Sequence, residues 1–147
     1  MQISINFTKE ISAPRKLVFG TITNFGSLQK TLPNVFRSVR ILEQKKDYAI
    51  TEEEFLVFGT IMKQRSMHTI ENPSRHIVHI IDGELAGSTI VENYSDSVDG
   101  GTTVDVSADF NIGGILSILP APVLRPLVGD NLRRLFGELE DALKSSR

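Results

Sequence analysis

The first residues of the chain alternate between apolar and polar side chains. Residues 3–7 read Ile-Ser-Ile-Asn-Phe, which is the period of a strand with one buried face. The pattern changes at Pro14, whose fixed φ suits the first turn of a helix. Apolar residues then recur at helical spacing to about residue 25, and residues 27–32 can form one more turn. We therefore predict a strand followed by two short helices.

Residues 37–112 show one strand pattern after another, separated by short polar turns. Turns are expected at 45–47, 72–74, 82–83 and 99–101. Connections this short favour antiparallel neighbours, because a parallel pair needs a crossover of about a dozen residues. Residues 103–112 alternate most clearly, with Val104 and Phe110 on the apolar face. This region therefore predicts an antiparallel meander.

The C-terminal part has the spacing of an amphipathic helix. We predict this helix from about Leu127 to the end of the chain. Its apolar stripe consists of Val128, Leu132, Leu135, Phe136, Leu139 and Leu143. The segment before it is apolar but carries Pro120, Pro122 and Pro126, which limit regular structure.

These elements predict one α+β domain over residues 1–147. Its sheet has about six or seven antiparallel strands and is curved around the long C-terminal helix, because both must bury an apolar face. The two short helices follow the first strand. A curved sheet can enclose more volume than one helix fills, so we expect a cavity between them.

Composition narrows the classes of partner. The 147 residues carry a formal net charge of −2, with no basic stripe, so we expect no nucleic acid partner. Cysteine is absent, which excludes thiolate chemistry and disulfides. No apolar run reaches the roughly 20 residues of a spanning helix, and the first residues lack a signal-peptide pattern. We expect a cytoplasmic location, with peripheral association at a membrane as an open alternative.

Three motifs carry a resemblance to a known superfamily. Residues 11–19 read Ile-Ser-Ala-Pro-Arg-Lys-Leu-Val-Phe, 32–35 read Leu-Pro-Asn-Val, and 58–61 read Phe-Gly-Thr-Ile. The most specific is 108–116, a strand followed by Gly113 and Gly114. With them the chain resembles the START-like polyketide cyclase/dehydrase and lipid-transport (SRPBCC) superfamily, and within it carbon monoxide dehydrogenase G-subunit-like proteins. The resemblance implies a helix-grip fold that serves lipid, hormone or quinone binding, membrane recruitment or polyketide cyclisation.

Strand phase selects candidate cavity residues. Lys63 and Arg65 mark an outer face, which turns the other phase of residues 60–70 inward, and that phase is too polar for a dry core. The candidates for the cavity wall are Met62, Gln64, Ser66, His68, His79, Tyr94, Val106, Phe110, Leu132 and Phe136. A lid or a membrane-facing segment is expected at Ile115, Leu116, Ile118 and Leu119.

Polar residues in the meander leave two alternatives open. Glu52, Glu53 and Glu54 cannot all face outward on a strand. Either one or two of them face the cavity, or the strand is solvated or bulged there, and the rarity of buried carboxylates favours solvation. His76 and His79 lie on opposite faces, so one of them could join His68. We predict no metal, no cofactor and no assigned catalytic residue, because no ligand or nucleophile spacing is present.

These features favour a protein that binds or transports a hydrophobic small molecule such as a lipid, quinone or polyketide. Membrane or partner recruitment is a variant of that role. One alternative is a cyclase or dehydratase that uses a cavity carboxylate and a histidine as base and acid. Another is a protein-interaction module whose cavity is closed. The oligomeric state is left open.

Overall fold

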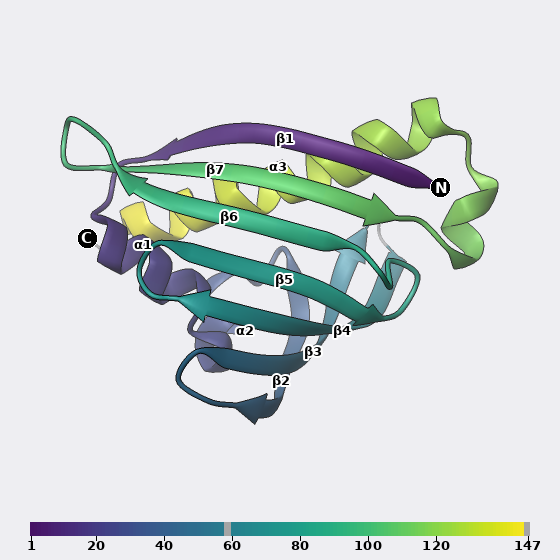
Figure 1. Ribbon diagram of the computed structural model, residues 1–147, viewed down its shortest axis with the longest axis horizontal. Helices are drawn as coiled ribbons and strands as arrows, with labels where there is room; N and C mark the ends of the chain where they lie inside the picture. The colour runs from purple at the N-terminus through teal and green to yellow at the C-terminus, as the bar shows by residue number, and fades with distance from the viewer. Residues whose placement is uncertain (58–59, 146–147) are drawn as a thin grey trace.

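The computed structural model describes residues 1–57 and 60–145 (Figure 1). Phe58 and Gly59, part of one motif of the resemblance, lie outside the described residues. Within them, seven strands form one antiparallel sheet in the order β1-β7-β6-β5-β4-β3-β2. The strands are β1 (Gln2–Ile11), β2 (Phe36–Gln44), β3 (Tyr48–Val57), β4 (Thr60–Glu71), β5 (Arg75–Asp82), β6 (Thr89–Asp96) and β7 (Thr102–Asn111). The predicted antiparallel meander is confirmed.

Two short helices and a 3-10 turn connect β1 to β2. They are α1 (Arg15–Ile22), η1 (Phe25–Ser27) and α2 (Leu28–Thr31). Pro14 caps α1, and its carbonyl accepts the amide of Val18 at 3.0 Å. Phe25 is buried and faces the sheet, where its ring contacts a histidine of β4. The connection therefore closes one end of the concave face.

The long helix α3 spans Ala121–Ser145, so its start near Leu127 was predicted six residues too late. Pro122 lies in the first turn, where backbone amides have no partner within the helix. Pro126 lies farther inside and removes one backbone bond. The predicted apolar stripe is confirmed, because Leu132, Phe136 and Leu139 are buried. Packing of this stripe outweighs the helix-breaking tendency of the prolines.

Strand alternation gives the sheet a buried concave face and an exposed convex face. In β7 the side chains of even-numbered residues from Val104 to Phe110 are buried, as predicted. In β4 the predicted phase is also confirmed, since Ser66 and His68 are buried while Lys63 and Arg65 are exposed. The sheet curves around α3, which crosses its concave side (Figure 1). The predicted helix-grip arrangement is therefore confirmed.

A short 3-10 helix, η2 (Gly114–Ile118), joins β7 to α3. Gly114 has a φ of 59°, and a Cβ at this position would lie 2.9 Å from the Glu84 side chain, so glycine suits this position in both respects. Among the described helices, none combines the length and apolar character needed to span a bilayer.

The packing of α3 supports a stability prediction. Phe136 is fully buried, and its ring meets that of Phe7 edge to face at 6.0 Å. Phe136→Ala should lower the free energy of unfolding by about 3–5 kcal/mol, because it removes apolar contacts and leaves a cavity. Urea unfolding followed by circular dichroism measures the change. Lys144→Ala, at an exposed position of the same helix, is the control, and an equal loss in both variants would contradict the prediction.

Candidate functional site

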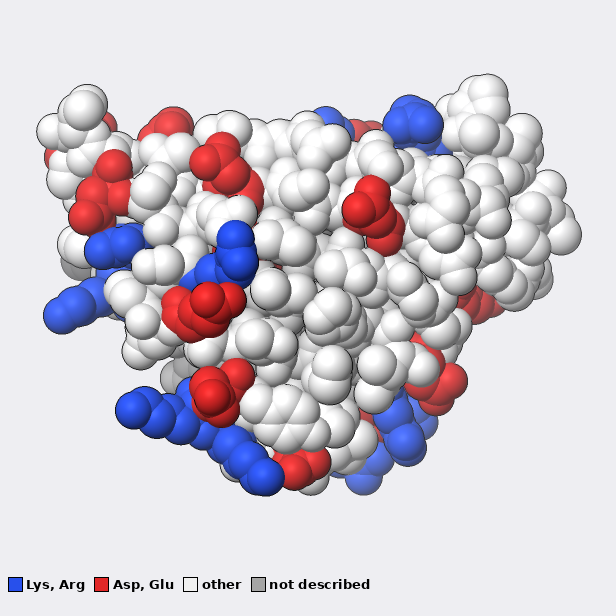
Figure 2. Space-filling view, in the orientation of Figure 1, with Lys and Arg blue, Asp and Glu red and all other residues white. Residues whose placement is uncertain are grey.

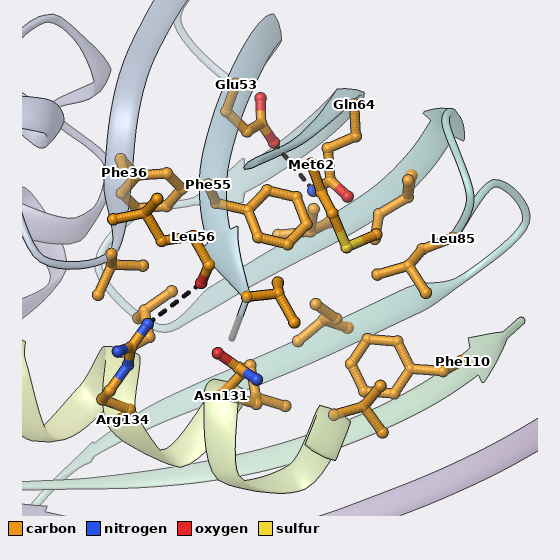
Figure 3. A pocket seen from close by; sticks show the side chains of 18 of the residues that line it. Phe36, Glu53, Phe55, Leu56, Met62, Gln64, Leu85, Phe110, Asn131 and Arg134 are labelled. Atoms are coloured by element: carbon orange, nitrogen blue, oxygen red, sulfur yellow. Dashed lines mark hydrogen bonds between the residues drawn. The ribbon is translucent and has the colours of Figure 1, made fainter. Parts of the chain in front are cut away.

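A cavity of about 150 Å³ lies between the concave face of the sheet and α3. Most of its wall is apolar and comes from β3 to β6, α3 and the α1–α2 connection. Figure 3 shows Glu53 and Gln64 on one side of this space and Asn131 and Arg134 of α3 on the other. The polar members of the wall are Glu53, Gln64, His68, His76, Glu92, Asn131 and Arg134. The cavity is thus an apolar space with one polar side on the sheet.

A groove of about 690 Å³ adjoins the cavity at the end of the molecule where β7 leads into α3. The cavity and the groove share four wall residues, Val57, Met62, Leu116 and Leu127. The cavity alone is smaller than the roughly 300–1,000 Å³ of ordinary ligand sites, whereas the groove lies within that range. A ligand could therefore extend from the groove past these apolar side chains into the cavity.

The polar side of the cavity is one continuous hydrogen-bonded row across four strands. Thr51 Oγ1 of β3 lies 2.8 Å from both Glu53 Oε2 and His68 Nε2. His68 Nδ1 lies 2.8 Å from His76 Nε2, and His76 Nδ1 lies 2.8 Å from Glu92 Oε1. We call these five residues the polar row. Every member is buried, so the row is shielded from bulk water.

Further side chains complete the bonding at both ends of the row. Tyr94 donates its hydroxyl to Glu92 Oε1 at 2.6 Å. At the other end Ser66 donates to Glu53 Oε1, and Gln64 Nε2 donates to the same oxygen at 3.3 Å. Buried polar atoms are costly unless they are hydrogen-bonded, and these contacts meet that requirement.

Burial changes the acid–base properties of Glu53. Desolvation raises the pKa of Glu53, although hydrogen bonds from Ser66, Thr51 and Gln64 act in the opposite direction. Its neighbour Glu52 points outward and shows the reverse: Arg40 and Arg65 bind its carboxylate and lower the pKa of Glu52 to about 2. Two adjacent glutamates on one strand therefore have opposite tendencies to hold a proton.

The histidine beside Glu53 is held in its neutral form. Desolvation, followed by the charge of His76, lowers the pKa of His68 well below its ordinary value. The ring of Phe25 lies 4.2 Å from the His68 ring, and the two imidazole rings stack at 5.0 Å. Burial likewise raises the pKa of Tyr94 well above its usual range, so Tyr94 keeps its proton.

The structure brings together five of the ten residues expected at the cavity wall. Those that line it are Met62, Gln64, His68, Phe110 and Leu132. Ser66, Tyr94, Val106 and Phe136 are buried but are not part of the wall. The placement expected for His79 is corrected: the buried phase of β5 is that of His76, Val78 and Ile80, so the odd-numbered His79 faces outward, near Thr89. Whether the five wall residues contact a ligand stays a prediction.

Three functional candidates were missed or left undecided. The alternative of a solvated strand end was favoured for the glutamates, yet Glu53 is only 5% exposed and lies in the polar row. Glu92 and Tyr94 share the inward phase of β6, and His76 has the inward phase of β5. Period-two alternation contained this signal, but it did not show which phase of each strand was buried.

The expected lid residues divide between the wall and the surface. Leu116 and Leu119 are half-buried and line the groove. Ile115 and Ile118 are 69% and 77% exposed. The lobe at the right of Figure 2, where η2 lies in Figure 1, shows few charged side chains. The groove therefore opens beside an exposed apolar surface.

Metal chemistry finds no support in the described part of the chain. Within residues 1–57 and 60–145, no three His, Asp or Glu side chains are grouped so that they could hold a metal ion. The donors of the polar row are already bound to one another.

Comparison with known proteins assigns the family. The model of the family described as the G subunit of carbon monoxide dehydrogenase (CoxG) matches residues 8–144. No curated protein matches the sequence.

Solved structures show the same fold at low identity. The protein TTHA0849 from Thermus thermophilus is 14% identical, with a TM-score of 0.86 over 98% of this chain and 99% of that one. A START superfamily protein from Mycobacterium smegmatis is 13% identical, with a TM-score of 0.84 over 98% and 99%. The Zhui aromatase/cyclase from Streptomyces sp. R1128 is 17% identical, with a TM-score of 0.78 over 100% and 97%.

The burial of Glu53 predicts a pH-dependent stability. Its raised pKa means that the folded protein binds more protons than the unfolded chain once the pH exceeds about 4.3. The free energy of unfolding therefore falls as pH rises through the folded pKa. Glu53→Gln removes this titration, so its stability relative to wild type should increase with pH, by at most about 1.4 kcal/mol per unit. Urea unfolding across a pH series measures the difference.

The neighbouring glutamate provides a control of opposite sign. The lowered pKa of Glu52 contributes stability that is present above the unfolded pKa and is lost as pH falls through the folded pKa. Glu52→Gln should therefore lose stability relative to wild type as pH rises from acid values. The same sign in both variants would contradict the assigned environments.

Proposed function

The chain belongs to the CoxG family of carbon monoxide dehydrogenase, and from this membership and the cavity we propose that it binds a hydrophobic small molecule. The supporting observation is an apolar cavity with one hydrogen-bonding side that continues into a surface groove. Folds of this family commonly bind hydrophobic ligands. Candidates include a lipid, a quinone or a polyketide-like molecule.

Affinity would come mainly from apolar burial. Each Å² of apolar surface removed from water contributes about 25 cal/mol, so an alkyl or ring system within the cavity supplies most of the free energy. Phe55, Val78 and Leu132 belong to this wall. An oxygen on the ligand would be oriented by the polar side at Gln64 and His68. This division follows the usual pattern, in which a few polar groups orient a ligand held by apolar walls.

Ligand exchange would take place through the groove. Ile115 and Ile118 expose apolar surface beside it, and a carrier must exchange its cargo with another apolar phase. Peripheral contact of η2 with a membrane or with a partner protein is therefore the second part of the proposed role.

An acid–base enzyme is a second candidate. Glu53 and His68 line the same cavity, which is the arrangement that a cyclase or dehydratase of this fold would require. One solved structure of similar fold bears the name aromatase/cyclase.

A matched pair of tryptophan variants tests ligand binding. Ile90 lies on the cavity wall, whereas Val91 has the opposite phase of β6. The neutral dye N-phenyl-1-naphthylamine should bind wild-type protein saturably. Ile90→Trp should weaken binding at least about tenfold, because each 1.4 kcal/mol of lost contact is a factor of ten. Val91→Trp should bind like wild type.

Fluorescence titration gives the affinities, and circular dichroism checks that both variants fold. Native mass spectrometry of the purified protein would show whether a hydrophobic molecule copurifies. A wild-type protein that neither carries a ligand nor binds the dye would contradict the proposal and favour an interaction module with a closed cavity.

A further inference from the structure

The polar row joins two carboxylates through one hydroxyl and two imidazoles. Glu53, His68, His76 and Glu92 all line the cavity, and Thr51 bridges the first two. Each of the four links is 2.8 Å long. Because Thr51 has one proton and a neutral imidazole donates from one nitrogen only, the direction of one link determines the directions of the others.

In the first order, Thr51 donates to His68 Nε2. His68 then donates from Nδ1 to His76 Nε2, and His76 donates from Nδ1 to Glu92. The oxygen of Thr51 is left as an acceptor toward Glu53. Glu53 must therefore carry a proton and donate it, in agreement with its burial.

In the second order, every link is reversed. Thr51 donates to an ionised Glu53, His68 donates from Nε2 to Thr51, and His76 donates from Nε2 to His68. The proton that Glu53 has lost now lies on Glu92, between its oxygen and His76 Nδ1. Both orders contain the same number of protons. The row therefore holds one acid and one base at all times, and a shift along it exchanges the two roles.

We infer that Glu53 transfers protons on a carbonyl compound bound in the cavity, converting a β-diketone between its keto and enol forms. The polar row supplies the ionised form of Glu53 by moving the proton of Glu53 to Glu92. This inference rests on the proposed function, since it requires a bound hydrophobic ligand.

The step balances with one residue acting on the substrate. Ionised Glu53 takes the proton from the carbon between the two carbonyl groups, so the C–H bond breaks and an O–H bond forms on the carboxyl group. The electron pair of the C–H bond becomes the C=C bond of an enolate, and the charge moves to oxygen. Glu53 then returns the proton to that oxygen, and the carboxylate is restored. No oxidant, reductant or metal is consumed.

The surroundings of Glu53 suit this chemistry. Apolar walls exclude water, and a desolvated carboxylate is a stronger base than one in water. The groups that face it on the sheet are Thr51, Ser66 and Gln64, with Glu52 pointing to the other side. Across the cavity, α3 contributes Asn131 and the cationic Arg134, which donates to the carbonyl of Leu56 at 3.2 Å.

Lauroylacetone, a β-diketone with one long alkyl chain, is the probe. Diluted from an apolar solvent as its enol, it converts to the keto form in buffer, and the loss of enol absorbance gives the rate. Wild-type protein should accelerate this conversion about 10²- to 10⁴-fold at saturation, the usual contribution of general acid–base catalysis. Displacement of N-phenyl-1-naphthylamine measures binding of the same compound in the same samples.

Variants assign the roles. Glu53→Gln should bind lauroylacetone within about threefold of wild type, because the side chains are isosteric, but should not accelerate the conversion. Glu54→Gln, whose side chain pairs with Ser38, should keep the wild-type rate. Binding without acceleration in wild type, or equal acceleration in Glu53→Gln, would overturn the inference while leaving the proposed function intact. A failure to displace the dye, in a protein that binds it, would overturn the inference for this ligand class.

Glu92 is a positioning residue with its own readout. In wild type the proton of Glu53 can move to Glu92, so the rate should change little across neutral pH. In Glu92→Gln that acceptor is lost and Glu53 must release its proton to solvent, so the rate should rise with pH. A profile equal to that of wild type would overturn the role of the polar row.

Discussion

The position of α3 on the sheet determines the rest of the structure. The helix packs most closely on β1, at one edge of the sheet. Because a straight helix cannot fill a curved sheet, the inner faces of β3 to β6 are left to line a cavity. The α1–α2 connection closes one end, where Phe25 covers the histidines. The groove remains at the other end, beside η2. Site and core are thus two parts of one concave surface.

That concave surface carries polar side chains that a solid core would not tolerate. Leaving a buried carboxylate or imidazole without a partner costs free energy on the order of 1–3 kcal/mol or more. The protein meets this cost by bonding the polar groups to one another in sequence, from Glu53 to Glu92 and Tyr94. A satisfied network of this kind has few alternative arrangements. The same bonds that make the polar side tolerable also make its protons interdependent.

Binding and proton transfer place different demands on this site, and the structure separates them in space. The apolar wall, including Phe55 and Leu132, provides contact area without charge. The polar row lies on the sheet alone, on strands whose register fixes Thr51 opposite Ser66 and His76 opposite Glu92. Rigid strands hold the reacting groups, while ligand exchange is confined to the groove and η2 at the end of the molecule. A neutral hydrophobic ligand can therefore be held whether or not its oxygen exchanges a proton.

Much of this could be predicted from the sequence alone. Alternation in residues 103–112 and the stripe on the last helix determine which faces are buried, because periods of 2 and 3.6 residues follow from backbone geometry. The inward phase of Met62, Gln64, Ser66 and His68 followed from Lys63 and Arg65 in the same way. Cross-strand neighbours do not follow from period alone. Whether His76 or His79 joined His68, and whether Glu53 was solvated, depended on strand register and on the curvature of the sheet over α3. Only tertiary structure decides these, because a single buried polar group is unfavourable by itself and becomes acceptable only when its partners arrive from other strands.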